Sequence, residues 1–132
     1  MAGAPRLDNR PISPHLQVWR WHVTMLSSIL HRATGVALYG ALIGLALWLM
    51  IAAGGVEKYE NIAPHLSAWY GQAALYLIVA ALAYHLANGV RHLVFDAGAG
   101  LAPSDADASA WFAILVALAA PIGLWLLLAY EG

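Results

Sequence analysis

A histidine lies within a long uncharged stretch of this chain. The run Leu66–Val90 contains no Asp, Glu, Lys or Arg, yet it includes His85 and is followed directly by Arg91 and His92. A titratable ring at the depth of lipid tails is costly, and such residues usually have a function. Because neutral imidazole is a common axial ligand of haem iron, His85 indicates a buried redox cofactor. The alternative is that it only donates a hydrogen bond to a neighbouring helix.

The residues around His85 repeat at helical spacing. His92 follows seven residues later and Gly89 follows four residues later, so all three share one face of a helix. A glycine there leaves room for a flat porphyrin against the backbone, although it would equally allow two helices to pack closely. The chain has one obvious deep histidine, so a second ligand for six-coordinate iron would come from elsewhere.

A second set of polar side chains lies at the start of an earlier apolar run. Ser28 and Arg32 are four residues apart and therefore share a helix face. A hydroxyl and a guanidinium together suit a quinone carbonyl, with the arginine stabilising negative charge that develops on reduction. The adjacent His31 points about 100° away around the helix axis, available to a partner such as a carboxylate. The alternatives are a packing serine and an arginine that anchors the helix at the membrane surface.

The composition identifies the elements that must hold these side chains. The chain has 132 residues, of which 62% are hydrophobic and only 10% are charged, whereas soluble domains carry about 25% charged residues. Three uncharged runs, Ala33–Ala53, Leu66–Val90 and Ala110–Tyr130, each reach the roughly 20 residues that span a bilayer. Inside lipid such runs form helices. The sequence predicts an all-α integral membrane bundle of three transmembrane helices.

We expect one membrane-anchor domain over residues 1–132, with an arm at residues 1–23. The spans are expected at about 28–53, 66–94 and 109–130. The segments Gly54–Pro64 and Asp96–Ser109 are expected to be loops, with Pro103 among the residues that end the second helix.

The basic residues predict the orientation of the chain. Five of the six Lys and Arg side chains fall on one side of the membrane, and Lys58 is the exception. The positive-inside rule then places the N-terminus in the cytoplasm and the C-terminus outside.

The chain has no cysteine, which excludes disulfides, thiolate ligands and covalent haem attachment. Nothing in the net charge of −1 indicates nucleic-acid binding.

Three motifs resemble the cytochrome b membrane-anchor subunit of succinate dehydrogenase, respiratory complex II. They are R-P-I-S-P-H-L-Q (Arg10–Gln17), S-I-L-H-R-A-T-G (Ser28–Gly35) and H-L-A-N-G-V-R-H-L-V-F-D-A-G (His85–Gly98). The likeness covers the proline-containing arm, the three spans and the topology, although the third span matches only in length and apolarity. One departure is Asn88, where small apolar residues are common in relatives, and its role is open.

The resemblance implies specific roles for the candidate residues. His85 would be an axial ligand of haem b, and a small sister anchor subunit would supply the other histidine. Ser28 and Arg32 would line the ubiquinone site beside the iron–sulfur subunit. His31, and by extension His92, would lie by the haem propionates.

The implied protein is a subunit outside the catalytic core of succinate:quinone oxidoreductase, in the bacterial inner membrane with a periplasmic C-terminus. A flavoprotein subunit would oxidise succinate and pass electrons through iron–sulfur clusters to the quinone, and Arg10–Gln17 would contact these peripheral subunits. The alternatives are the anchor of a quinol:fumarate reductase, or a non-redox structural subunit whose histidines only bridge helices. A dihaem cytochrome would need deep histidine pairs in more than one span, and only His85 qualifies.

Overall fold

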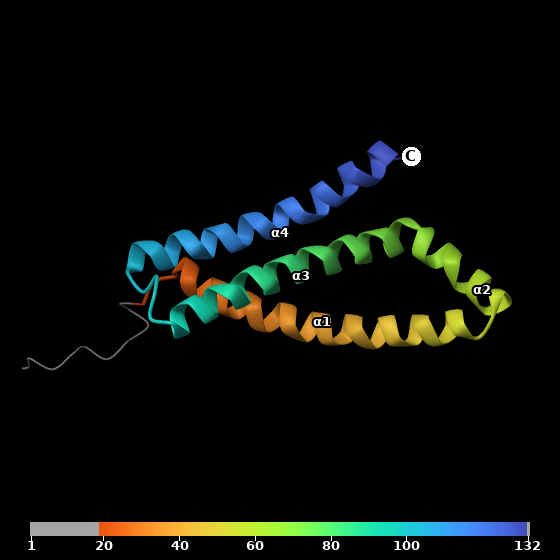
Figure 1. The fold of residues 1–132 in the computed structure, drawn as a ribbon, viewed down its shortest axis with the longest axis horizontal. Coiled ribbons are helices and arrows are strands. Elements are labelled where there is room, and N and C mark those ends of the chain that lie inside the picture. The colour runs from red at the N-terminus through yellow and green to blue at the C-terminus, as the bar shows by residue number, and fades with distance from the viewer. Residues whose placement is uncertain (1–18, 132) are drawn as a thin grey trace, which may run out of the picture.

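The computed structural model describes residues 19–131, which fold into four helices and no strands (Figure 1). The helices are α1 (Val23–Ala53), α2 (Val56–Ser67), α3 (Trp69–Asp96) and α4 (Pro103–Glu131). Of these, α1, α3 and α4 are long and apolar enough to cross a membrane. The predicted all-α fold with three transmembrane helices is therefore confirmed. The predicted contacts of Arg10–Gln17 lie outside the described residues.

The spanning helices expose most of their apolar side chains. Leu42, Leu77 and Leu127 are 61%, 70% and 65% exposed, one on each of the three long helices. Such exposure would be unfavourable in water, where burial of a leucine contributes about 1.5–3 kcal/mol. In a bilayer these faces contact lipid tails or other subunits, and the backbone satisfies its own hydrogen bonds within each helix.

The segment Gly54–Pro64, expected to be a loop, is mostly helical. Only Gly54 and Gly55 separate α1 from α2, and Gly55 has a φ of 110°, which favours glycine. From Val56 onward no residue interrupts a helix until Pro64, and Glu57 in the first turn interacts favourably with the helix dipole. The second span consequently begins at Trp69 instead of about residue 66, after Ala68 adopts an extended conformation.

The loop before the last helix is also shorter than the expected Asp96–Ser109. Pro103 is the first residue of α4, where the missing proline N–H costs nothing because a helix leaves its first N–H groups unpaired. The prediction that Pro103 helps to end the second helix was wrong, since α3 already ends at Asp96. The first span also begins early, at Val23, because the His22 carbonyl accepts hydrogen bonds from the amides of Met25 and Leu26.

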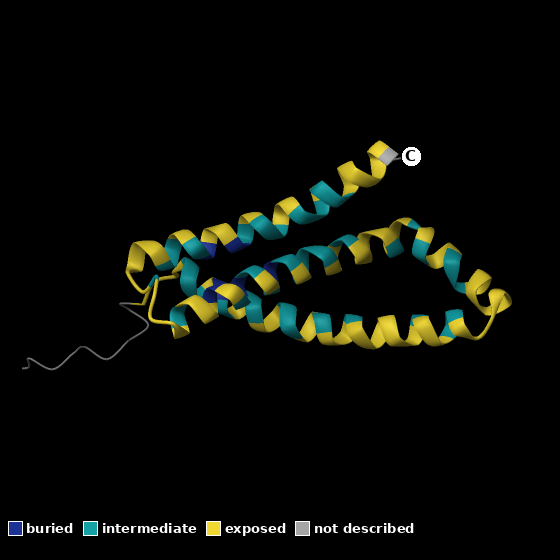
Figure 2. Ribbon diagram, in the orientation of Figure 1, coloured by how far each residue is buried: buried dark blue, intermediate teal, exposed yellow. Residues whose placement is uncertain are grey.

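The three long helices converge at one end and spread apart at the other (Figure 1). α3 runs between α1 and α4 and packs against both. Every buried residue of the described chain lies toward the converging end, formed by the start of α1, the end of α3 and the start of α4 (Figure 2). These residues are Ser27, Tyr84, Asn88, Arg91, Ala110 and Ala113. The interior of this bundle is thus half polar, and it occupies one end only.

Candidate functional site

Three histidines meet where α1 packs against α3. The rings of His31 and His85 stack with their centroids 4.1 Å apart and their planes 16° from parallel. The ring of His92 lies 5.1 Å from that of His31 at a tilt of 46°. Helical spacing predicted that His85 and His92 share a face of one helix, and the structure adds His31 from the facing helix. We refer to these three side chains as the histidine cluster.

The ring of His85 is held closely against α1. Its Nδ1 lies 3.2 Å from the Oγ1 of Thr34. A Cβ atom built on Gly35 would lie 3.2 Å from the His85 Cε1, so a side chain at position 35 would press on the imidazole and shift it by a few tenths of an ångström. His85 itself is partly buried.

One buried nitrogen of the histidine cluster has no hydrogen-bond partner among the described residues. The Nε2 of His31 is buried and makes no hydrogen bond within the described chain. It faces the backbone of α3 at Gly89, where a Cβ atom would lie 3.9 Å away. A buried polar atom without a partner costs about 1–3 kcal/mol, so this nitrogen is suited to a polar group that the chain itself does not supply.

The histidines do not form a chelating metal site by themselves. Within residues 19–131 no group of three or more His, Cys, Asp or Glu side chains is arranged to hold a metal ion. The rings of His31 and His85 stack face to face instead of directing nitrogens at one point. A metal bound by His85 would therefore take its other ligands from outside residues 19–131.

Ser28 and Arg32 lie on the outer side of the same region. Both are in the first third of α1, one helical turn apart. Arg32 is exposed and Ser28 is partly buried, whereas the neighbouring Ser27 is fully buried in the bundle. No hydrogen bond joins Ser28 to Arg32 among the residues that the structure describes. Their groups are available to a ligand or subunit on this face of α1.

A buried polar network, which the sequence analysis did not predict, lies beside the histidine cluster. The hydroxyl of Ser27 donates to the Asn88 Oδ1 at 2.7 Å, and both side chains are completely buried. The hydroxyl of Tyr84 donates to the Ser27 carbonyl at 2.8 Å and lies 3.1 Å from the Ser27 Oγ. Asn88, whose role was open, thus joins α3 to α1.

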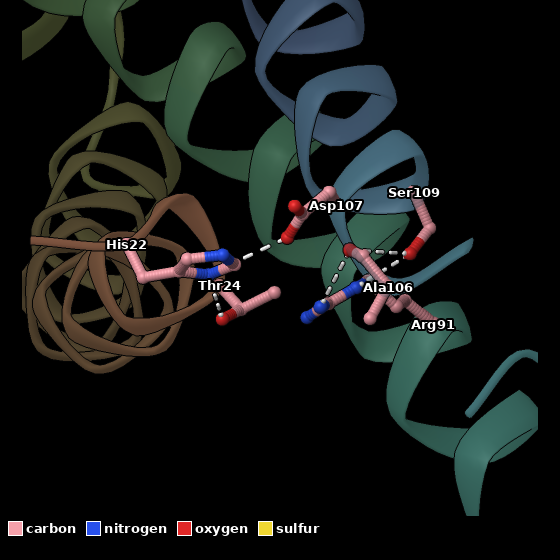
Figure 3. A network of polar contacts seen from close by, with 6 residues as sticks. All are labelled: His22, Thr24, Arg91, Ala106, Asp107 and Ser109. Atoms are coloured by element: carbon pink, nitrogen blue, oxygen red, sulfur yellow. Dashed lines mark hydrogen bonds and ion pairs between the residues drawn. The ribbon is translucent and has the colours of Figure 1, made fainter. Parts of the chain in front are cut away.

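Arg91 extends this network to α4. Its guanidinium donates from Nε to the Ser109 Oγ at 2.8 Å and from Nη2 to the Ala106 carbonyl at 3.0 Å (Figure 3). A longer contact of 3.4 Å joins its Nη1 to the Asn88 Oδ1, and the guanidinium carbon lies 4.5 Å above the centre of the Phe95 ring. The buried charge is therefore held by neutral acceptors and an aromatic face.

The same end carries a weaker surface contact. The Nδ1 of His22 lies 3.4 Å from an Asp107 carboxylate oxygen and 2.9 Å from the Thr24 hydroxyl, which links the start of α1 to the start of α4 (Figure 3). Both partners of the ion pair are more than a third exposed. Exposed pairs contribute little to stability, so the buried network holds the helices at this end.

The sequence carried a signal for the network. Tyr84, Asn88 and Arg91 are spaced i, i+4 and i+7, so they form a polar stripe on one face of an otherwise apolar helix. Polar side chains in a span face the bundle interior, and this stripe is the face of α3 that packs between its neighbours.

Comparison with known proteins places the chain among membrane subunits. The family model described as "Succinate dehydrogenase/Fumarate reductase transmembrane subunit" matches residues 6–124. The "Succinate dehydrogenase cytochrome b556 subunit" of Rickettsia felis is 34% identical over 119 residues, covering 89% of this chain and 92% of that protein. The subunit of the same name from Paracoccus denitrificans is 39% identical over 101 residues, covering 76% and 78%. The mitochondrial "Succinate dehydrogenase cytochrome b560 subunit" of Sus scrofa is 33% identical over 121 residues, covering 89% and 70%.

Proposed function

Because this chain belongs to the succinate dehydrogenase/fumarate reductase transmembrane subunit family, we propose that it is the haem b-binding anchor of a succinate dehydrogenase and forms part of the ubiquinone site. The observation that carries the proposal is the histidine cluster, in which His85 from one span stacks on His31 from another. Relatives named cytochrome b subunits support a haem as the bound group.

The residues of the cluster fit a haem. Neutral imidazole is a common axial ligand of haem iron, and His85 supplies one such ring. The buried, unpartnered Nε2 of His31 suits the carboxylate of a haem propionate, and no side chain at Gly89 stands between this nitrogen and the backbone of α3. His92, exposed at the edge of the cluster, would serve the same propionates.

A second small anchor subunit would complete the iron site. Among the residues that the structure describes, His85 is the candidate ligand and no chelating metal site is present, so the second histidine would come from this partner. When bound, haem b supplies a one-electron carrier close to the quinone. The protein's part is to hold the ring of His85 in place and to keep water away from it.

Ser28 and Arg32 would bind ubiquinone on the outer face of α1. The Ser28 hydroxyl would donate a hydrogen bond to one quinone oxygen. The Arg32 guanidinium would stabilise the negative charge that develops there during reduction. The exposure of Arg32 supports a position at the boundary with the iron–sulfur subunit, which delivers electrons from the succinate-oxidising flavoprotein subunit.

The end with the histidine cluster would face the cytoplasm of a bacterial cell. Arg20, Arg32 and Arg91 all lie toward this converging end, whereas Lys58 lies on α2 at the opposite end (Figure 1). The positive-inside rule then places the described start of the chain inside and the end of α4 in the periplasm. The peripheral subunits would dock on the same cytoplasmic side.

A difference spectrum of the purified complex tests the haem. We would isolate the complex from native membranes in mild detergent through this chain and record the dithionite-reduced minus oxidised absorbance. We expect sharp b-type bands, which His85→Leu should abolish or shift. The control is His65→Leu, because His65 is exposed on α2, away from the histidine cluster, and its Nδ1 lies beside the Tyr70 hydroxyl. An unchanged spectrum and midpoint potential in His85→Leu would reject axial ligation, and a flat spectrum from an intact succinate-oxidising complex would reject the haem.

A further inference from the structure

We propose that Thr34 positions the ring of His85 for iron ligation, by accepting a hydrogen bond from its Nδ1–H. This inference rests on the proposed function, in which His85 is the axial ligand. Thr34 does not touch the iron, so it is a positioning residue.

The direction of the hydrogen bond follows from the neighbours of the Thr34 hydroxyl. Its Oγ1 lies 2.8 Å from the Leu30 carbonyl oxygen and 3.0 Å from the His31 carbonyl oxygen, both one turn earlier in α1. A hydroxyl has one proton, and carbonyl oxygens only accept. Threonine in a helix commonly donates to these carbonyls. The proton is therefore engaged by α1, and an oxygen lone pair is left to face His85.

The Nδ1 of His85 must then carry a proton. It lies 3.2 Å from the Thr34 Oγ1, and a contact between two lone pairs at this distance would be repulsive. In a neutral imidazole only one nitrogen is protonated. The Nε2 therefore keeps its lone pair, and this is the nitrogen that can bond to iron. If the tautomer were reversed, the proton on Nε2 would block ligation.

The ring is also confined by two further contacts. On one side it lies close to the backbone of Gly35, where an added Cβ would be 3.2 Å from the His85 Cε1, a tight contact, and 3.8 Å from its Nδ1. On another side the His31 ring is stacked at 4.1 Å. Thr34 adds the directional contact that sets rotation of the imidazole about its own axis. Three residues within little more than one turn of α1, His31, Thr34 and Gly35, thus hold one ring.

A hydrogen bond to the nitrogen of a histidine that does not bind the metal affects both the metal affinity of the site and the electronic properties of the metal. A hydrogen bond accepted from the distal N–H of a ligating histidine fixes its tautomer and raises its basicity, and its loss typically costs 10- to 100-fold in metal affinity or activity. A hydroxyl is a weaker acceptor than a carboxylate, so we expect the lower end of this range. Greater basicity favours ferric over ferrous iron, so loss of the contact should raise the haem midpoint potential.

The matched variants are Thr34→Val and Thr34→Ser in the intact complex. Valine keeps the shape and removes the oxygen, whereas serine keeps the oxygen. We expect Thr34→Val to weaken haem retention by about tenfold, to raise the midpoint potential in a redox titration and to change the electron paramagnetic resonance signal of the ferric haem. Thr34→Ser should resemble the unaltered complex in all three measurements. A tenfold change in the preference for ferric iron corresponds to 59 mV.

The outcomes separate this inference from the proposed function. If His85→Leu removes the b-type spectrum but Thr34→Val changes neither haem retention, potential nor resonance signal, the role of Thr34 is wrong and the ligand assignment stands. If His85→Leu leaves the spectrum unchanged, the proposed function itself fails. Should Thr34→Val not assemble, electron–nuclear double resonance on the unaltered complex remains decisive. A hyperfine coupling of the exchangeable Nδ1 proton that indicates a hydrogen-bonded N–H on the ligand assigned to His85 supports the inference, and the coupling of an N–H without an acceptor overturns it.

Discussion

Replacing Asn88 with leucine tests whether the buried polar network holds the three spanning helices together. The Asn88 Oδ1 accepts a 2.7 Å hydrogen bond from Ser27 and a 3.4 Å contact from Arg91. Leucine has a similar branched shape, is somewhat larger, and accepts neither. The change therefore leaves a completely buried serine hydroxyl and part of a buried guanidinium without their acceptor.

The expected magnitude follows from two opposing contributions. Leaving a buried donor unsatisfied costs about 1–3 kcal/mol. However, the Nδ2 of Asn88 is itself buried without a partner, so its removal offsets part of this cost. Measured polar contacts between spanning helices average about 0.6 kcal/mol and reach about 1.7 kcal/mol. We expect Asn88→Leu to destabilise the bundle by about 1–2 kcal/mol and Ser27→Ala by less, with a coupling energy of about 0.6–1.7 kcal/mol between them.

The measurement is a sodium dodecyl sulfate titration of the chain in mixed micelles. The chain has no cysteine of its own, so cysteines introduced at Ile29 on α1 and Phe112 on α4 can carry a fluorescent donor and acceptor. Both positions are exposed, at 47% and 63%, and lie near the packed end. Loss of energy transfer reports separation of the helices. A double-mutant cycle then isolates the pairwise energy of the Ser27–Asn88 contact.

Leu86→Ala is the control, because Leu86 lies on α3 two residues before Asn88 and is 66% exposed. We expect it to change stability by less than about 0.5 kcal/mol. A coupling energy below about 0.3 kcal/mol, or a loss in Asn88→Leu no larger than that of the control, would refute the argument that the network stabilises this end.

Two further substitutions test the charged residues. Arg32→Leu should slow quinone reduction by about 10- to 100-fold while succinate oxidation by a dye acceptor continues unchanged, since Arg32 is exposed and supports no buried contact. Equal loss of both activities would contradict a quinone role. Arg91→Leu should lower stability in the same titration by about 2–3 kcal/mol, because Ser109 and Ala106 lose their donor. Arg91→Lys should recover only part of this, since an ammonium group lacks the planar fork, and full recovery would show that charge alone matters.

The hydrophobic runs were sufficient to predict the three spans, because the bilayer imposes a minimum length and excludes unpaired backbone groups. Connections between spans were harder to predict. The segment that forms α2 is polar, and its polarity predicts a loop, although its residues from Val56 to Ala63 are all compatible with a helix. Pro103 is ambiguous by nature, because a proline both ends one helix and suits the first position of the next.

The candidate site was predictable one helix at a time. Spacing along α3 placed His85 and His92 on one face, which the structure shows. Single-helix geometry could not show that His31 stacks on His85, because that depends on how α1 is rotated about its axis against α3. The same rotation decides that Ser27, and not the adjacent Ser28, enters the bundle. Two neighbouring serines look equivalent in the sequence.

The polar contacts also constrain the order in which the chain can be built into a membrane. Ser27 is synthesised 61 residues before Asn88, and Arg91 precedes Ser109 by 18 residues. During biosynthesis α1 therefore enters the bilayer with its serine unpartnered, and α3 and α4 can close on each other as a local hairpin. A nascent chain that stops before Ala106 leaves the guanidinium of Arg91 without its α4 acceptors at the edge of the bilayer. Addition of α4, and not the pairing of α1 with α3, is what completes the contacts of the buried charge.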